Sequence, residues 1–134
     1  MWQTIKIIDF SYGHRLLNYE GPCSQPHGHN GRIEIVCESN ILNESGMIMD
    51  FSKIKSIIKK FVDDNWDHKM LLKREDPLLN YFLEKGEKVF VMDENPTAEI
   101  LARYLFYFAK KQNLPIVEIR FHETLSSIAC YRED

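Results

Sequence analysis

Residues 31–38, GRIEIVCE, alternate between two kinds of side chain in a way that constrains the fold. Ile33, Ile35 and Cys37 fall on one face, and the residues between them, most of which are charged, fall on the other. This period of two residues is typical of a strand in an antiparallel sheet that buries one face. The sequence therefore predicts such a sheet, with other elements covering its apolar face.

Two segments with the helical period are predicted to form the covering layer. The first, MDFSKIKSIIKKFVDDNW, has Asp50 as its expected N-cap, a residue type that often caps a helix. The second, ENPTAEILARYLFYFAKKQN, has Asn95 as its expected cap and Pro96 in its first turn. Lys110 and Lys111 suit its C-terminal end. We expect both helices to pack on the same face of the sheet.

Further strands are predicted at residues 2–12, 87–92, 116–122 and 127–132. The segment NILNESGM predicts a turn, which would make residues 31–50 a hairpin. The order of elements indicates a single α+β domain over residues 1–134, with an antiparallel sheet of about four strands and two helices on one face. The open edges of such a sheet favour an oligomer that closes them.

Composition excludes several classes of partner. The net charge is −3, and the 17 basic and 20 acidic residues are well mixed, which argues against a nucleic-acid-binding surface. No stretch approaches the roughly 18 apolar residues of a membrane helix, and the N-terminus lacks the pattern of a secretory signal. Three cysteines in such a chain favour a reducing, cytoplasmic location without a disulfide framework.

Residues 22–31, PCSQPHGHNG, place one thiol and two imidazoles in a short polar segment. If the strand already begins here, His27 and His29 point to the same side as the apolar residues that follow. His14, at the end of the first predicted strand, could supply a third imidazole. Three neutral imidazoles suit Zn²⁺ and leave a fourth position free for catalysis. The residues alone leave open a surface turn, or a closed structural zinc site with Cys23 as fourth ligand.

The three cysteines are predicted to differ in role. Cys37 and Cys130 lie in apolar strand segments and are expected to be small core residues. Cys23 lies in a polar turn, where a thiol would gain little stabilisation from packing against apolar side chains. A cation or imidazole nearby would favour its thiolate form, so we interpret Cys23 as reactive.

Five other polar residues are candidates for function. Asp67 and His68 form either a solvated loop or a proton relay. Glu123 continues the apolar parity of residues 117–121, so its carboxylate faces the buried side and needs a partner if the strand persists that far. Thr97 and Glu99 are fully explained as the first turn of a helix.

Several segments together resemble the 6-pyruvoyl-tetrahydropterin synthase and 6-carboxy-tetrahydropterin synthase superfamily. They are FSYGHRL, C-x-x-x-H-G-H-N, MIMDFSKIK, WDHKML, NPTAEILARYL and HETLSSIACY, in the family's order and over nearly the whole chain. The resemblance implies the tunnelling fold. It also implies trimers that close their sheets into a barrel, and two stacked trimers that form a homohexamer with sites between subunits.

The resemblance further implies a zinc-dependent lyase that acts on 7,8-dihydroneopterin triphosphate, a small-molecule substrate. The implied metal ligands are His14, His27 and His29; the proton-transfer residues are Cys23, Asp67 and His68; and the pterin-binding residues are Glu123, Thr97 and Glu99.

The chain also departs from the family's pattern. Tyr12 and Gly13 precede H-R-L, where the family usually has two small residues, and Leu72 and Ile100 stand where asparagine is frequent. Ile100 favours the carboxy branch, which belongs to the queuosine route and yields 6-carboxytetrahydropterin, acetaldehyde and triphosphate. The alternatives are the pyruvoyl branch and a non-catalytic module that binds pterin or zinc.

Overall fold

The computed structural model describes all residues from Met1 to Asp134. In chain order the elements are β1 (Trp2–His14), the 3₁₀ turn η1 (Pro22–Ser24), β2 (His27–Ser39), α1 (Phe51–Asn65), β3 (Met70–Lys73), α2 (Leu78–Glu84), β4 (Val89–Met92), α3 (Ala98–Lys111), β5 (Ile116–Thr124) and β6 (Ser127–Tyr131). The α+β class is confirmed.

All six strands form one sheet in the order β4-β3-β1-β2-β5-β6. The antiparallel pairs β1–β2, β2–β5 and β5–β6 form its larger part. The short strands β3 and β4 add a parallel extension, and β3 joins β1 only at Gly13 and His14. The predicted antiparallel sheet of about four strands was therefore too small. The strand predicted at residues 87–92 is present as β4, whereas β3 was not predicted, because four residues are too few to show a period.

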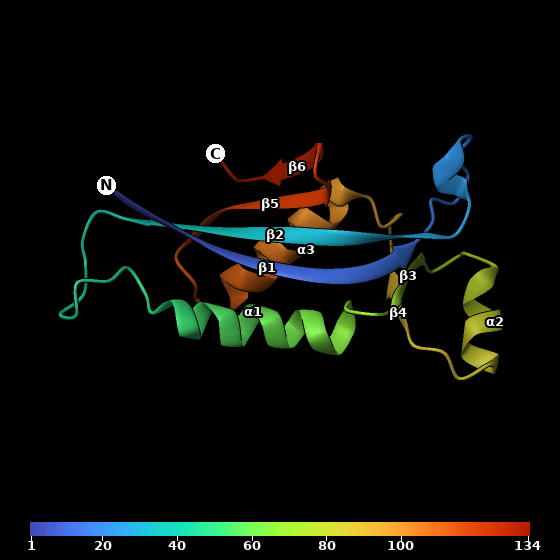
Figure 1. The fold of residues 1–134 in the computed structure, drawn as a ribbon, viewed down its shortest axis with the longest axis horizontal. Helices are drawn as coiled ribbons and strands as arrows, with labels where there is room; N and C mark the ends of the chain where they lie inside the picture. The colour runs from blue at the N-terminus through green and yellow to red at the C-terminus, as the bar shows by residue number, and fades with distance from the viewer.

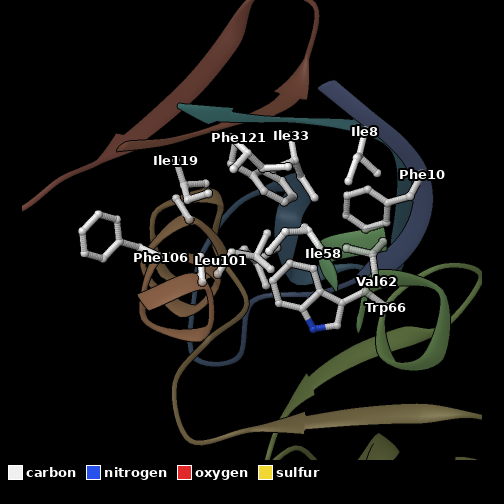
Figure 2. Packing of buried hydrophobic residues seen from close by; sticks show 14 of the residues in the cluster. Ile8, Phe10, Ile33, Ile58, Val62, Trp66, Leu101, Phe106, Ile119 and Phe121 are labelled. Carbon is white, nitrogen blue, oxygen red and sulfur yellow. The ribbon is translucent and has the colours of Figure 1, made fainter. Parts of the chain in front are cut away.

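Helices α1 and α3 cover one face of the sheet, as predicted, and leave the other face open (Figure 1). On α1 the buried residues Ile54, Ile58 and Val62 recur every four positions, so one stripe of this helix faces the sheet. Trp66, at the end of α1, is fully buried and lies in the centre of the core between helices and strands (Figure 2). A third helix, α2, was not predicted; it is short and has no buried residue.

The predicted hairpin over residues 31–50 is wrong, because the chain after Ser39 does not return as a strand. The Asn43 side chain accepts hydrogen bonds from the backbone N–H groups of Ser45 and Met47, which holds residues 43–47 in a local loop. The antiparallel partner of β2 is instead β1, along the full length of both strands from Trp2↔Ser39 to His14↔His27.

The helix caps were predicted correctly for α1 and wrongly for α3. The Asp50 side chain accepts a hydrogen bond from the Ser52 N–H at 2.8 Å, as a cap does. For α3 the cap is Thr97, whose hydroxyl accepts from the Ile100 N–H at 3.2 Å. The predicted cap, Asn95, uses its side-chain amide to bond the backbone N–H and C=O of Leu17. Lys110 and Lys111 do lie in the last turn of α3.

The prediction for Cys130 is also wrong, whereas Cys37 is buried as expected. On β6, Tyr131 turns toward the helices and packs on the core, so Cys130 faces the open side opposite Arg120. No helix of the structure is both long and apolar enough to cross a membrane.

A buried ion pair between Arg15 and Asp76 links the residue after β1 to the loop before α2. Asp76 is 3% exposed and accepts hydrogen bonds from the Arg15 guanidinium and, at 2.9 Å, from the Leu78 N–H. Burial alone would raise the pKa of Asp76, but these hydrogen bonds outweigh it and lower the pKa below its ordinary value.

We expect Asp76→Ala to lower the free energy of unfolding by about 1–3 kcal/mol at pH 7, because Arg15 loses its partner. Since the folded pKa of Asp76 is depressed, its contribution is complete above the unfolded pKa and is lost as pH falls through the folded one. Urea unfolding at pH 7 and pH 3 measures both effects. Equal destabilisation at the two pH values would contradict this role.

Candidate functional site

Three histidines meet where β1 ends and β2 begins. The register pairs Tyr12 with His29 and His14 with His27, and strand alternation directs His14, His27 and His29 to the face that carries the core. The Nε2 atom of His14 lies 3.0 Å from that of His27 and 3.2 Å from that of His29. One ligand atom of each ring falls within 4.8 Å of the others. The predicted convergence of the three imidazoles is confirmed.

Backbone carbonyls fix the tautomers of two of these rings. The Nδ1 of His14 lies 2.7 Å from the Pro96 carbonyl oxygen, and the Nδ1 of His27 lies 2.6 Å from that of Gln25. Since a carbonyl oxygen only accepts, each Nδ1 must carry the proton and donate it. In the neutral rings both Nε2 lone pairs are then bare and face each other, an arrangement that a shared cation stabilises.

Burial keeps the centre of the cluster uncharged. His14 is 1% exposed, and desolvation is the main cause that lowers its pKa to about 4. Burial also lowers the pKa of His29, while the charge of Glu123 opposes that shift. A neutral imidazole is the form that binds a metal ion, so at neutral pH the donor set fits a divalent cation such as Zn²⁺.

Glu123 directs its carboxylate toward this cluster. Its Oε1 lies 3.8 Å from the His29 Nε2, and its Oε2 lies 4.0 Å from the His14 Nε2. Glu123 lies within β5, next to a register shift in the pairing of β5 with β6 between His122 and Thr124. The predicted orientation of Glu123 toward the buried side is therefore confirmed.

A pocket of about 300 Å³ adjoins the cluster and contains several of the predicted site residues. Cys23, on η1, shares this pocket with His14 and Glu123, and Thr97 and Glu99 reach it from the start of α3. The Cys23 sulfur is not part of the cluster formed by the imidazole nitrogens. The arrangement therefore supports an open three-histidine centre with a thiol beside it, rather than a closed four-ligand site.

Asp67 and His68 lie elsewhere in the same chain. They line a second, more polar depression of about 490 Å³ that also includes Asp9, Asn30, Arg32 and His122. The Ser11 N–H donates to the Asp67 carboxylate at 3.0 Å, and the His68 N–H donates to the Ser11 carbonyl at 2.6 Å. The Nδ1 of the His68 side chain lies 2.9 Å from an oxygen of the Asp67 carboxylate.

His68 adopts φ 58°, an unusual backbone conformation for this residue type. Asp67 and His68 therefore lie together, but within one copy of the chain they line a different depression from Cys23.

Sequence reasoning missed several supporting groups. No pattern marks the carbonyls of Pro96 and Gln25, because any residue carries a carbonyl. Tyr12 could have been found, since it departs from the small residue usual at that place. It is buried beside the rings of His14 and His29, and burial followed by the charge of Glu123 raises the pKa of its phenol.

Comparisons with known proteins agree with the geometry. The family model described as 6-pyruvoyl tetrahydropterin synthase matches residues 4–134. The chain is 35% identical to a 6-carboxy-5,6,7,8-tetrahydropterin synthase of Rickettsia conorii, over 92% of this chain and 95% of that protein. It is 30% identical to a protein of the same name from Haemophilus influenzae, over 99% and 100% of the two chains.

Two solved structures share the fold. One is an uncharacterized protein from Wolinella succinogenes, with a TM-score of 0.84 and 24% identity, covering 99% of this chain and 98% of that one. The other is a 6-pyruvoyl tetrahydropterin synthase of Caenorhabditis elegans, with a TM-score of 0.74 and 22% identity, covering 99% and 96%.

We expect His27→Ala to weaken Zn²⁺ binding by at least about a hundredfold, because it removes one of three donor nitrogens. Isothermal titration of metal-free protein with Zn²⁺ measures this. His122→Ala is the matched control, since this histidine bonds Glu34 on the open face and takes no part in the cluster. Retention of stoichiometric, tight Zn²⁺ by His27→Ala would show that the ligands are assigned wrongly.

Proposed function

The chain belongs to the 6-pyruvoyl tetrahydropterin synthase family, and we propose that it is the 6-carboxy-5,6,7,8-tetrahydropterin synthase of the queuosine route. The proposed reaction converts 7,8-dihydroneopterin triphosphate and water into 6-carboxytetrahydropterin, acetaldehyde and triphosphate. The observation that carries the proposal is the three-histidine cluster that opens on a pocket with a thiol and a carboxylate.

Glu123 is proposed to hold the pterin ring. A carboxylate in the wall of the pocket can accept two hydrogen bonds from adjacent N–H groups, such as a ring NH and the exocyclic amino group of a pterin. Thr97 and Glu99 line the same pocket and are proposed to contact the same end of the substrate. This arrangement would orient the ring and direct its side chain toward the histidines.

His14, His27 and His29 are proposed to hold Zn²⁺, which when bound supplies Lewis-acid stabilisation of negative charge on the substrate's side-chain oxygens. Cys23 is proposed to be the base that removes a proton from the neighbouring carbon. An unpaired thiol in this position suits a reducing, cytoplasmic location. Asp67 and His68 are proposed to accept and return that proton.

This relay requires two copies of the chain, because Cys23 and the Asp67–His68 pair line different depressions of one copy. We propose that the active site lies between subunits. Strand β6 has a neighbour on one side only, and β1 meets β3 only at its last two residues. Pairing of β6 with the free edge of β1 in the next copy would close the sheets into a barrel, as in the trimers and hexamers implied by the family.

Purified protein with Zn²⁺ and 7,8-dihydroneopterin triphosphate is expected to release acetaldehyde and a pterin that carries a 6-carboxyl group. We expect Cys23→Ala to lower kcat by at least about a hundredfold, the scale of a lost general base, while Zn²⁺ content stays the same. Cys130→Ala is the control thiol. Chromatography with mass detection identifies the pterin: a pyruvoyl side chain would assign the other branch, and an unchanged substrate would favour a non-catalytic module.

A mixing experiment tests the shared site. Cys23→Ala and Asp67→Asn homo-oligomers are each expected to be nearly inactive. When the two variants are unfolded and refolded together, random assembly should restore about a quarter of the wild-type turnover, because that share of interfaces has both intact residues. If both residues acted within one copy, the mixture would remain inactive.

A further inference from the structure

The phenol of Tyr12 is a buried polar group without a use in the fold. Tyr12 is 3% exposed, and its hydroxyl has no hydrogen-bond partner in the protein. A buried hydroxyl without a partner destabilises the folded state, and native proteins rarely retain one without a reason. A phenylalanine would fill the same space without that cost, so the hydroxyl calls for an explanation.

Gly31 determines where the Tyr12 ring lies. Tyr12 belongs to β1, yet its ring centroid is 5.8 Å from that of Phe121 on β5, although β2 runs between these strands. The Tyr12 ring lies against Gly31 of β2, where a Cβ atom would come within 3.1 Å of both the Tyr12 Cε1 and the Phe10 Cε1. The missing side chain of Gly31 therefore leaves the space through which Tyr12 extends toward β5.

The groups around the Tyr12 ring belong to the candidate site. Its centroid lies 5.2 Å from that of His14 and 5.6 Å from that of His29. The oxygens of Glu123 lie 3.8–4.0 Å from the Nε2 atoms of these two histidines, and Glu123 follows Phe121 by two residues on β5.

The Glu123 carboxylate, in turn, lacks a hydrogen-bond donor. Its side chain is 24% exposed, and its contacts with His14 and His29 are longer than hydrogen bonds. A donor without an acceptor and a carboxylate without a donor thus adjoin the same two histidines, His14 and His29.

We propose that Tyr12 is a positioning residue for Glu123: its hydroxyl donates a hydrogen bond to one oxygen of the Glu123 carboxylate when a ligand engages the other. Held in this way, the carboxylate presents a fixed acceptor to the N–H groups of the ligand. This inference rests on the proposed role of Glu123 as the group that binds the pterin ring.

The test compares Tyr12→Phe with the wild type in binding of 6-carboxypterin, a fluorescent oxidised analogue of the proposed product. We expect Kd to rise about tenfold, the effect of losing a hydrogen bond to a charged group, with KM for the substrate rising more than kcat falls. The unfolding midpoint should stay equal or rise, because the variant removes a buried hydroxyl. Tyr104→Phe, at a partly exposed tyrosine of α3 that lines a different depression, is the matched control.

A rise in Kd smaller than about threefold for Tyr12→Phe would overturn the proposal, because a lost charged hydrogen bond costs more. So would a loss of Zn²⁺ affinity without a loss of pterin affinity, since the phenol would then serve a histidine. Gly31→Ala, whose Cβ would press on the Tyr12 and Phe10 rings, should weaken pterin binding in the same direction. Unchanged pterin binding by this variant would contradict the idea that the space at Gly31 on β2 sets the position of the Tyr12 ring.

A double-mutant cycle separates this inference from the proposed function. In the Glu123→Gln background, Tyr12→Phe should have a smaller effect on Kd than in the wild type, because the two residues act together. If Glu123→Gln weakens pterin binding and Tyr12→Phe does not, only the role of Tyr12 fails. If Glu123→Gln binds the pterin as the wild type does, the role of Glu123 fails and that of Tyr12 fails with it.

Discussion

The candidate site depends on two imidazole nitrogens that face each other with bare lone pairs. The Nε2 atoms of His14 and His27 lie 3.0 Å apart, and both rings must carry their proton on Nδ1 because they donate to carbonyls. Nitrogens at about 2.0–2.1 Å from a tetrahedral zinc would be about 3.3 Å apart, so the fold holds the rings close to a metal-binding arrangement. Repulsion between these atoms is relieved when a cation lies between them.

The fold maintains this arrangement through strand pairing. The continuous β1–β2 ladder fixes His14 opposite His27, and any slip of one residue would turn the histidines to the open face. The Pro96 carbonyl comes from the segment before α3, and the Gln25 carbonyl from the segment between η1 and β2. The metal site is therefore coupled to the helix layer as well as to the sheet. The two faces of the sheet have separate roles: the covered face carries the histidines and Glu123, and the open face carries the Asp67–His68 pair.

Much of this could be predicted from the sequence where a strict period extends over many residues. The alternation from Ile33 back to His27 correctly predicted a shared face for His27 and His29, and the parity from Val117 correctly placed Glu123. Residue type alone did not decide which residue caps α3, because both Asn95 and Thr97 are good cap residues. Only the tertiary hydrogen bonds of Asn95 with Leu17 assign Asn95 another role. The distance between Cys23 and Asp67 had no signal in the sequence, because it depends on which face of the sheet each loop reaches.

X-ray absorption at the zinc edge, on zinc-loaded protein saturated with 6-carboxypterin, tests the central claim most directly. The account predicts three imidazole nitrogens at about 2.0–2.1 Å, with the remaining ligands being light atoms rather than protein sulfur. Fewer than three imidazoles, or a sulfur ligand at about 2.3 Å that persists with the pterin bound, would contradict an open three-histidine centre beside a free thiol.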